Sequence, residues 1–311
     1  MSLTSVTTVL AMTPHQRALL QLHLCVVAWG VTAVIGKIIT LGAMQLVWWR
    51  MLLVTLALAL LPRVWRALAG MPARLMLTYA GIGCVVALHW LAFYGSVKLA
   101  NASVAATTMA LAPAVTALIE PWLTGARFER HNLALGIAVI PGVAMVVGGI
   151  PGDMHLGFWV GVASSVLAAL FNALNKRYVS HHDAMAVTGL ELGAGFLLVT
   201  LITPLAAPAG ELFVLPSIHD GAWLLVLAIF CTLIPFAVAL AALRYLSAFT
   251  SQLAVNLEPV YAIALAVLFL GEAKELDALF YVGVTIVIAA VFGHGWLVSR
   301  NQPLTDESRS V

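Results

Sequence analysis

The residues best suited to chemistry lie in an otherwise apolar stretch, LAVNLEPVYAIALAVLFLGE at 253–272. Asn256, Glu258 and Pro259 follow one another closely there. A charged side chain at mid-bilayer costs about 2.5–3.5 kcal/mol, so it survives where it faces a polar cavity or a partner. Proline removes a backbone donor and frees the carbonyl of Val255 four residues back for a ligand or water. We predict a hydrated niche with Glu258 on its wall; the alternative is a packed kink in which Glu258 is neutral and hydrogen-bonded.

A second group of polar and aromatic residues surrounds His89, near the centre of the apolar stretch 75–97. Trp90 and Tyr94 share one face of a helix, while His89 and Phe93 share the adjacent stripe. A histidine there could bind a ligand or relay a proton, and the aromatic rings could stack on a flat or apolar ligand. The alternative is a structural histidine bonded to a backbone carbonyl among packing aromatics.

Polar side chains in other apolar stretches extend this set. Trp29 and Thr32 form a wall that serves either a cavity or close helix packing. Asn172 is predicted to face a cavity, whereas Lys176, four residues later, is interpreted as an anchor at the end of its helix. The predicted cavity residues are Trp29, Thr32, His89, Trp90, Tyr94, Asn172, Asn256, Glu258 and Tyr261.

Two further charges, Arg50 and Glu191, lie inside apolar stretches at corresponding places, six or seven residues from the start of 44–62 and 184–207. We predict that both are structural. A buried pairing with each other or with loop carbonyls is favoured over contact with a substrate.

The composition shows what kind of protein carries these residues. Of the 311 residues 62% are hydrophobic and 9% charged, with a mean hydropathy of +1.04, whereas a soluble domain is about 45–50% apolar and about 25% charged. Apolar stretches of about 18–25 residues suit membrane-spanning helices rather than β-strands. The basic residues are scattered among loops, so nucleic-acid binding is not expected. Three cysteines within apolar stretches are interpreted as small buried hydrophobes, and no metal or cofactor is expected.

The expected fold is therefore an all-α polytopic membrane protein with ten transmembrane helices. The predicted spans are 17–37, 44–62, 75–97, 101–124, 132–150, 155–178, 184–207, 221–245, 249–270 and 278–298. Residues 1–16 lack the features of a signal peptide and are predicted to be a cytoplasmic segment. Residues 301–311 are predicted to be a disordered cytoplasmic tail.

The loops predict the orientation of these spans. With the first segment inside, eleven Lys and Arg residues lie on the cytoplasmic side and three outside, and Arg50 lies within a span. The excess of positive charge on cytoplasmic loops then places both termini inside.

Two halves, 17–150 and 151–300, are predicted to be repeats. Aligning Pro113 with Pro259 also superimposes Leu111 on Leu257 and Gly125 on Gly271. Five spans per half is an odd number, so homologous halves must cross the membrane in opposite directions. Such inverted repeats are typical of transporters that expose a midplane site to each side in turn.

Several motifs together resemble a known family. They are AWGVTAVIGK (28–37), VWWR (47–50), ALHWLAFYGSVKLANASVA (87–105), ALFNALNKR (169–177) and SAFTSQLAVNLEPVYAIALAVLFLGE (247–272). With ten predicted spans, the chain resembles the EamA-type carriers of the drug/metabolite transporter superfamily over residues 18–298. One departure is visible, because the first half has GARFE where the second has the pair Gly271–Glu272.

The resemblance implies a bacterial inner-membrane exporter of a small metabolite such as an amino acid, with a central cavity. We expect a secondary transporter that works by alternating access, with protons as a candidate coupling ion. No Walker A pattern is present, so direct use of ATP is not expected. A passive channel or facilitator is the main alternative, and an intramembrane enzyme is disfavoured.

Overall fold

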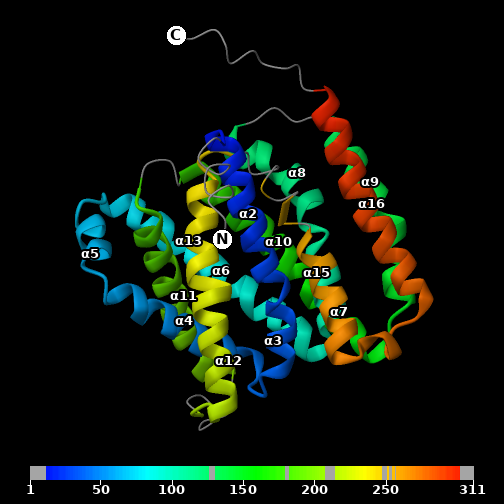
Figure 1. Ribbon diagram of the computed structural model, residues 1–311, viewed down its shortest axis with the longest axis horizontal. Coiled ribbons are helices and arrows are strands. Elements are labelled where there is room, and N and C mark those ends of the chain that lie inside the picture. Colours follow the sequence, from blue (N-terminus) through cyan, green and yellow to red (C-terminus); the bar gives the residue numbers. More distant parts are fainter. Residues whose placement is uncertain are drawn as a thin grey trace, which may run out of the picture.

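The computed structural model describes residues 12–125, 130–178, 182–206, 214–246, 251, 254–255 and 257–301. Every regular element among these residues is a helix (Figure 1). Predictions for Asn256, residues 1–11 and the tail from 302 lie outside the described residues.

Among its described residues, the first half of the chain forms eight helices. They are α2 (Pro14–Gly30), α3 (Thr32–Ile38), α4 (Ala43–Ala59), α5 (Pro62–Ala69), α6 (Ala73–Leu99), α7 (Ala102–Met109), α8 (Ala112–Thr124) and α9 (Arg130–Gly148).

The second half continues with a similar succession, interrupted by short 3₁₀ and π-helical turns. Its elements are η1 (Gly152–Met154), α10 (His155–Tyr178), α11 (Ala184–Ala206), α12 (Ile218–Ala228), η2 (Ile229–Leu233), α13 (Ile234–Ala242), α15 (Leu257–Leu265), η3 (Ala266–Leu270), η4 (Glu272–Lys274) and α16 (Ala278–Asn301).

Six helical stretches of the described chain are long and apolar enough to cross a membrane, and a seventh would be the bent pair α4–α5. Three shorter apolar helices lie at Ile137–Gly148, Leu257–Leu270 and Ala278–Gly293. The predicted all-α fold and the apolar spans are therefore confirmed, while the number of ten transmembrane helices remains a prediction.

The sequence did not reveal α5. The chain turns by 84° after α4 and begins a new helix at Pro62, a residue that suits the first helical position because its missing N–H is not needed there. Val64 is buried, whereas Arg63 and Trp65 are exposed. This two-sided character is typical of a helix lying along the edge of a membrane protein.

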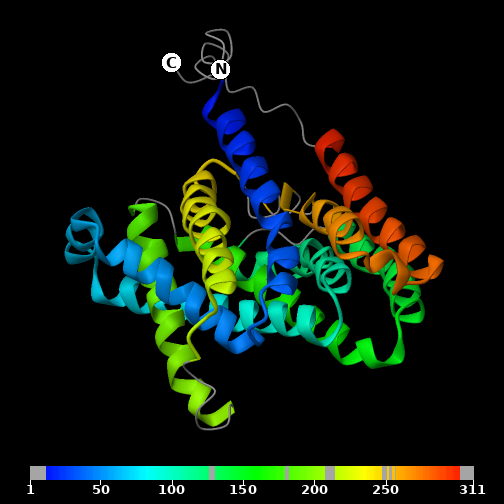
Figure 2. The ribbon, with the colours of Figure 1, turned by 60° about the horizontal axis from the view of Figure 1, so that its bottom comes forward.

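Equivalent helices of the two halves pack in equivalent ways. The pairs α4·α11 and α9·α16 each join counterparts, and α9 with α16 forms one edge of the molecule in both ribbon views (Figures 1 and 2). In the second half α13 is the counterpart of α6, and it packs on α2 as α6 packs on α10. Likewise α15 is the counterpart of α8, and it packs on α2 as α8 packs on α10. Exchanging the halves thus preserves these helix contacts.

Glycines permit the closest of these contacts. A Cβ at Gly83 of α6 would lie 2.0 Å from the carbonyl oxygen of Glu191 in α11. A Cβ at Gly142 of α9 would lie 2.8 Å from the carbonyl oxygen of Gly283 in α16. Small residues at helix contacts allow backbones to approach in this manner.

At one end of the molecule a carboxylate joins the two halves. Glu272, which is buried, accepts hydrogen bonds from the backbone N–H groups of Ala102 (2.9 Å) and Ser103 (2.8 Å) at the start of α7. Asn101 also donates to Glu275 at 3.0 Å. Free N–H groups and the helix dipole favour negative charge at a helix N-terminus, so these contacts close this end firmly.

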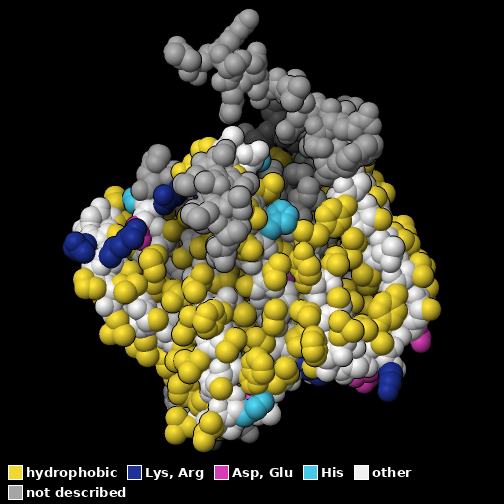
Figure 3. All heavy atoms as spheres, viewed as in Figure 1, with side chains coloured by type: hydrophobic (Ala, Val, Ile, Leu, Met, Phe, Trp, Pro, Cys, Tyr) yellow, Lys and Arg dark blue, Asp and Glu magenta, His cyan; other side chains and the backbone are white. Residues whose placement is uncertain are grey.

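The surface matches a membrane environment. Hydrophobic side chains cover much of the visible face, and the coloured charged groups lie near its periphery (Figure 3). Large apolar side chains such as Trp122, Leu201 and Phe269 are mostly exposed. A patch of this extent would be unusual for a soluble monomer, and lipid tails can cover it.

Gly83→Ala should destabilise the protein, because its Cβ cannot fit against the Glu191 carbonyl. Overpacking of this kind costs about 1–3 kcal/mol, so the apparent melting temperature in detergent should fall. Gly81→Ala is the matched control on the same helix, with no atom within 4 Å of the new Cβ. An equal change in both variants would contradict the close packing of α6 on α11.

Asp183 should stabilise the protein at neutral pH and lose this effect in acid. It accepts from the N–H groups of Met185 and Ala186 at the start of α11 and pairs with Arg63. Although partial burial raises the pKa of Asp183, the Ala186 N–H and Arg63 lower it, and the pKa lies below its usual value.

Because the folded-state pKa is depressed, this stabilisation is present above the ordinary carboxyl pKa and is lost as the pH falls through the folded value. Asp183→Asn should therefore lower the free energy of unfolding at pH 7 by at most ~1 kcal/mol, seen as a lower melting temperature. This deficit should shrink as the pH falls below the ordinary carboxyl pKa. Asp153→Asn, at an exposed turn, is the control. A deficit that persists unchanged into acid would refute the electrostatic explanation.

Candidate functional site

A cavity of about 90 Å³ lies where helices of both halves meet. Since each water needs about 10–15 Å³ of such space, it has room for about six to nine waters. The first half contributes α2, α3, α4, α6 and α7, and the second contributes α10, η2, α13 and α15. The lining residues are Trp29, Thr32, Arg50, His89, Trp90, Phe93, Met109, Ala168, Phe171, Asn172, Asn175, Thr232, Phe236, Ala239, Leu240, Leu243, Val255 and Glu258.

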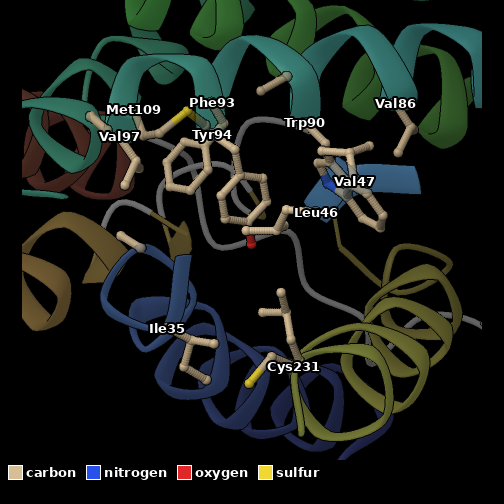
Figure 4. Close-up of a cluster of buried hydrophobic side chains, with 14 of the residues drawn as sticks. Ile35, Leu46, Val47, Val86, Trp90, Phe93, Tyr94, Val97, Met109 and Cys231 are labelled. Carbon is tan, nitrogen blue, oxygen red and sulfur yellow. The ribbon is translucent and has the colours of Figure 1, made fainter. Parts of the chain in front are cut away.

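Aromatic rings form much of this wall. Trp90 of α6 meets Phe236 of α13 with ring centroids 6.4 Å apart, and Phe171 of α10 lies 6.5 Å from Phe236 and 5.4 Å from His89. Trp90, Phe93 and Met109 point toward the same interior from neighbouring helices in Figure 4. The rings therefore offer an apolar surface on which an organic body can stack.

Arg50 projects from α4 into this aromatic environment. Its Nε donates to Thr232 Oγ1 at 2.6 Å, its Nη1 to the Tyr94 hydroxyl at 2.8 Å, and its Nη2 to the Cys231 carbonyl at a long 3.4 Å. Trp90 covers one face of the guanidinium at 3.8 Å from the ring centroid, a cation–π contact. The group is buried and firmly oriented.

Thr232, which accepts from Arg50 Nε, is positioned by an irregular turn between α12 and α13. Thr232 lies in the π-helical turn η2, and its hydroxyl donates to the carbonyl of Leu227 five residues back. Pro235 follows at the start of α13 and cannot donate to the preceding turn. This turn presents Thr232 Oγ1 as an acceptor toward α4, and π-turns are frequent at functional sites.

Glu258, in the first turn of α15, faces the cavity from the second half. Among the described residues no side chain forms an ion pair with it, because the ion pairs found there are Arg63–Asp183 and His219–Asp220. Arg50 and Glu258 thus contribute opposite charges to one cavity without direct pairing to each other.

His89 lies on the wall and is also tied to the backbone. Its Nδ1 contacts the carbonyl oxygen of Ser164 at 3.0 Å and the Ser164 hydroxyl at 2.8 Å. A carbonyl can only accept, so Nδ1 carries the hydrogen, and in the neutral ring Nε2 is an acceptor. His89 thus lies on the cavity wall, where a ligand could reach it, and it is also bonded to a backbone carbonyl, as a structural histidine would be.

Metal coordination has no support in this geometry. Among the residues that the structure describes, no group of at least three His, Cys, Asp or Glu side chains could hold a metal ion.

Comparison with known proteins identifies the family. The sequence model of the EamA-like transporter family matches the chain twice, at residues 16–148 and 155–295. The chain belongs to the EamA-like transporter family. The resemblance based on the motifs is thus confirmed, and the protein is a transporter-like, multi-pass membrane protein with two copies of the EamA domain.

A solved structure titled "Crystal structure of protein" shares the fold. The two superimpose with a TM-score of 0.66 at 17% identity, covering 93% of this chain and 99% of the other. No curated protein matches the sequence.

The cavity brings together most of the residues that the sequence singled out. Trp29, Thr32, His89, Trp90, Asn172 and Glu258 all line it. Tyr94 instead lies behind the wall, where it is fully buried and its hydroxyl accepts from Arg50. Tyr261 lies against Gly30 of α2 and is 38% exposed.

The expected pairing of Arg50 with Glu191 is wrong. Arg50 faces the cavity, whereas Glu191 is buried beside α10, where Asn175 donates to it at 3.4 Å. The two residues occupy corresponding places in their halves, but the EamA repeats direct them to different surroundings.

Several cavity residues were missed because their types are ordinary in a core. Phe171, Phe236 and Met109 carry no polar signal, and Thr232 is a common residue in apolar helices. Helical spacing offered one usable clue, since Phe93 lies four residues from His89 on the same face.

Thr232→Val should destabilise the EamA fold by about 1–3 kcal/mol, because a buried guanidinium N–H loses its acceptor while the side-chain volume is kept. The measurement is the apparent melting temperature in detergent. Thr285→Val on α16 is the control, because its exposed hydroxyl bonds only to its own helix at Tyr281. If both variants melt at the wild-type temperature, Thr232 does not hold Arg50.

Proposed function

We propose that this protein is a secondary transporter that exports a small metabolite, an amino acid or a related compound, across the bacterial inner membrane by alternating access. The observation that carries the proposal is the cavity between two copies of the EamA domain, lined by both and containing charged and aromatic side chains. Such a site is suited to a small organic molecule with polar ends.

Alternating access is supported by the relation between the halves. Several of their main helix contacts are preserved when the halves are exchanged, and an odd number of spans per half would make the repeats inverted. Rocking of inverted repeats exposes a midplane site to each side in turn. In this conformation Glu272 and Asn101 tie the halves together at the end of the molecule where α6 finishes.

The charge of the loops supports an orientation with both termini in the cytoplasm. The end closed by Glu272 would then be the extracytoplasmic one, and the cavity would load from the cytoplasm, as export requires.

A passive facilitator is the competing function, and saturation distinguishes the two. Purified protein in proteoliposomes should show saturable counterflow of an amino acid from a metabolite panel, whereas an open pore would show flux proportional to concentration. Glu258→Gln and His89→Ala should each reduce this flux at least about tenfold, because each removes a group on the cavity wall.

The same vesicles with an imposed pH gradient test proton coupling. The gradient should stimulate wild-type flux and not that of Glu258→Gln. Asp153→Asn, far from the cavity in an exposed turn, should behave as wild type. Unchanged flux and pH response in both cavity variants would refute this site.

A further inference from the structure

We propose that the cavity selects a zwitterion with an apolar or aromatic body, binding its anionic group at Arg50 and its cationic group at Glu258. This inference rests on the proposed function and assigns Arg50 to substrate recognition. Arg50 and Glu258 come from different halves and line the same cavity.

Arg50 has unused donors in a suitable place. A guanidinium has five N–H groups, and among the described residues its partners are Thr232, Tyr94 and the distant Cys231 carbonyl. One N–H therefore remains on each terminal nitrogen, Nη1 and Nη2. These two nitrogens can bind a carboxylate side by side.

The approach to Arg50 is also restricted. Trp90 covers one face of the guanidinium at 3.8 Å, and Thr232 holds its Nε. A ligand must therefore arrive at the edge that carries Nη1 and Nη2, which fixes the orientation of its anionic group.

Glu258 provides the complementary end. Its carboxylate can only accept when ionised, and it forms no ion pair with another side chain in the described part of the chain. An ammonium group has donors for both of its oxygens. The same cavity is lined by Trp90, Phe171 and Phe236, whose rings suit an apolar body.

Charge balance explains why one ligand should carry both groups. Removing a charge from water is costly unless it is paired. A singly charged ligand that displaces cavity water would pair one of the two residues and leave the other desolvated and unpaired. A zwitterion satisfies both and leaves the net charge of the cavity unchanged.

The wild-type protein tests this rule without any substitution. Binding of L-phenylalanine, 2-phenylethylamine and 3-phenylpropionate is measured at pH 7 from the concentration dependence of the melting temperature in detergent. Phenylalanine should bind at least about tenfold more tightly than either analogue, because a hydrogen bond to a charged group contributes about 1.5–3 kcal/mol. Equal or tighter binding of a singly charged analogue, or no binding of phenylalanine, would overturn the proposal.

Two variants then test which residue binds the anionic group of the ligand and which binds its cationic group. In Glu258→Gln the advantage of phenylalanine over 3-phenylpropionate should fall below about threefold, since the ammonium no longer finds a carboxylate. In Arg50→Gln the advantage of phenylalanine over 2-phenylethylamine should fall below about threefold, since the carboxylate no longer finds the guanidinium. Arg50→Lys keeps the charge and should keep the zwitterion preference, which shows that the charge matters. If Arg50→Gln does not fold, the order of ligands in Glu258→Gln decides the proposal.

Charge-matched controls lie outside the cavity. Arg74→Gln and Asp153→Asn, both exposed, should retain the wild-type order of ligands. If all variants keep that order, Arg50 and Glu258 are not the recognition groups.

Failure of this inference can be told from failure of the proposed function. Saturable counterflow of amino acids without the charge rule would leave the transporter intact and refute zwitterion selection. Binding that follows the charge rule without flux would support the site and refute transport.

Discussion

Placing the guanidinium of Arg50 inside an apolar helical protein requires polar partners, and that requirement ties three parts of the structure together. Thr232 in the π-turn of one helix and Tyr94 in α6 accept its hydrogen bonds, while Trp90 covers its face. A buried ion that lost these contacts would be destabilising by several kcal/mol. The position of α4 against α6 and η2 is therefore determined by a charge as well as by packing, and the irregular turn at Thr232 belongs to the same arrangement.

The two halves share a packing scheme but differ in their polar contacts. Arg50 faces the cavity, whereas its counterpart Glu191 is buried beside Asn175. Glu272 closes one end by accepting from the N–H groups at the start of α7. In the alignment of the halves this position corresponds to Ala126, which has no carboxylate. A similar helical frame thus carries different charges in its two halves.

Sequence reasoning succeeded where one physical constraint acts on a whole segment. Hydrocarbon thickness determines the length and polarity of a span, so the apolar helices were predictable from composition alone. Polar residues inside them, such as Glu258, Asn172 and His89, were predictable as cavity residues because burial against lipid is costly. What the sequence did not reveal depends on partners distant in sequence. Tyr94 bonds to Arg50 and Tyr261 lies against Gly30, the partner of Arg50 lies 182 residues away at Thr232, and α5 is too short to give a span signal.

The separation of Arg50 from Glu258 has a consequence for movement between conformations. Arg50 has hydrogen-bond partners in Thr232 and Tyr94, but Arg50 and Glu258 do not form an ion pair with each other. Closing the cavity around them without a ligand would exclude water and leave the Glu258 carboxylate and the remaining donors of Arg50 unpaired. A zwitterion replaces the water at both ends at once, so the loaded cavity can close with both charges paired. On the mechanism proposed above, the substrate therefore lowers the cost of the closed intermediate, which favours exchange of bound substrate over movement of the empty carrier.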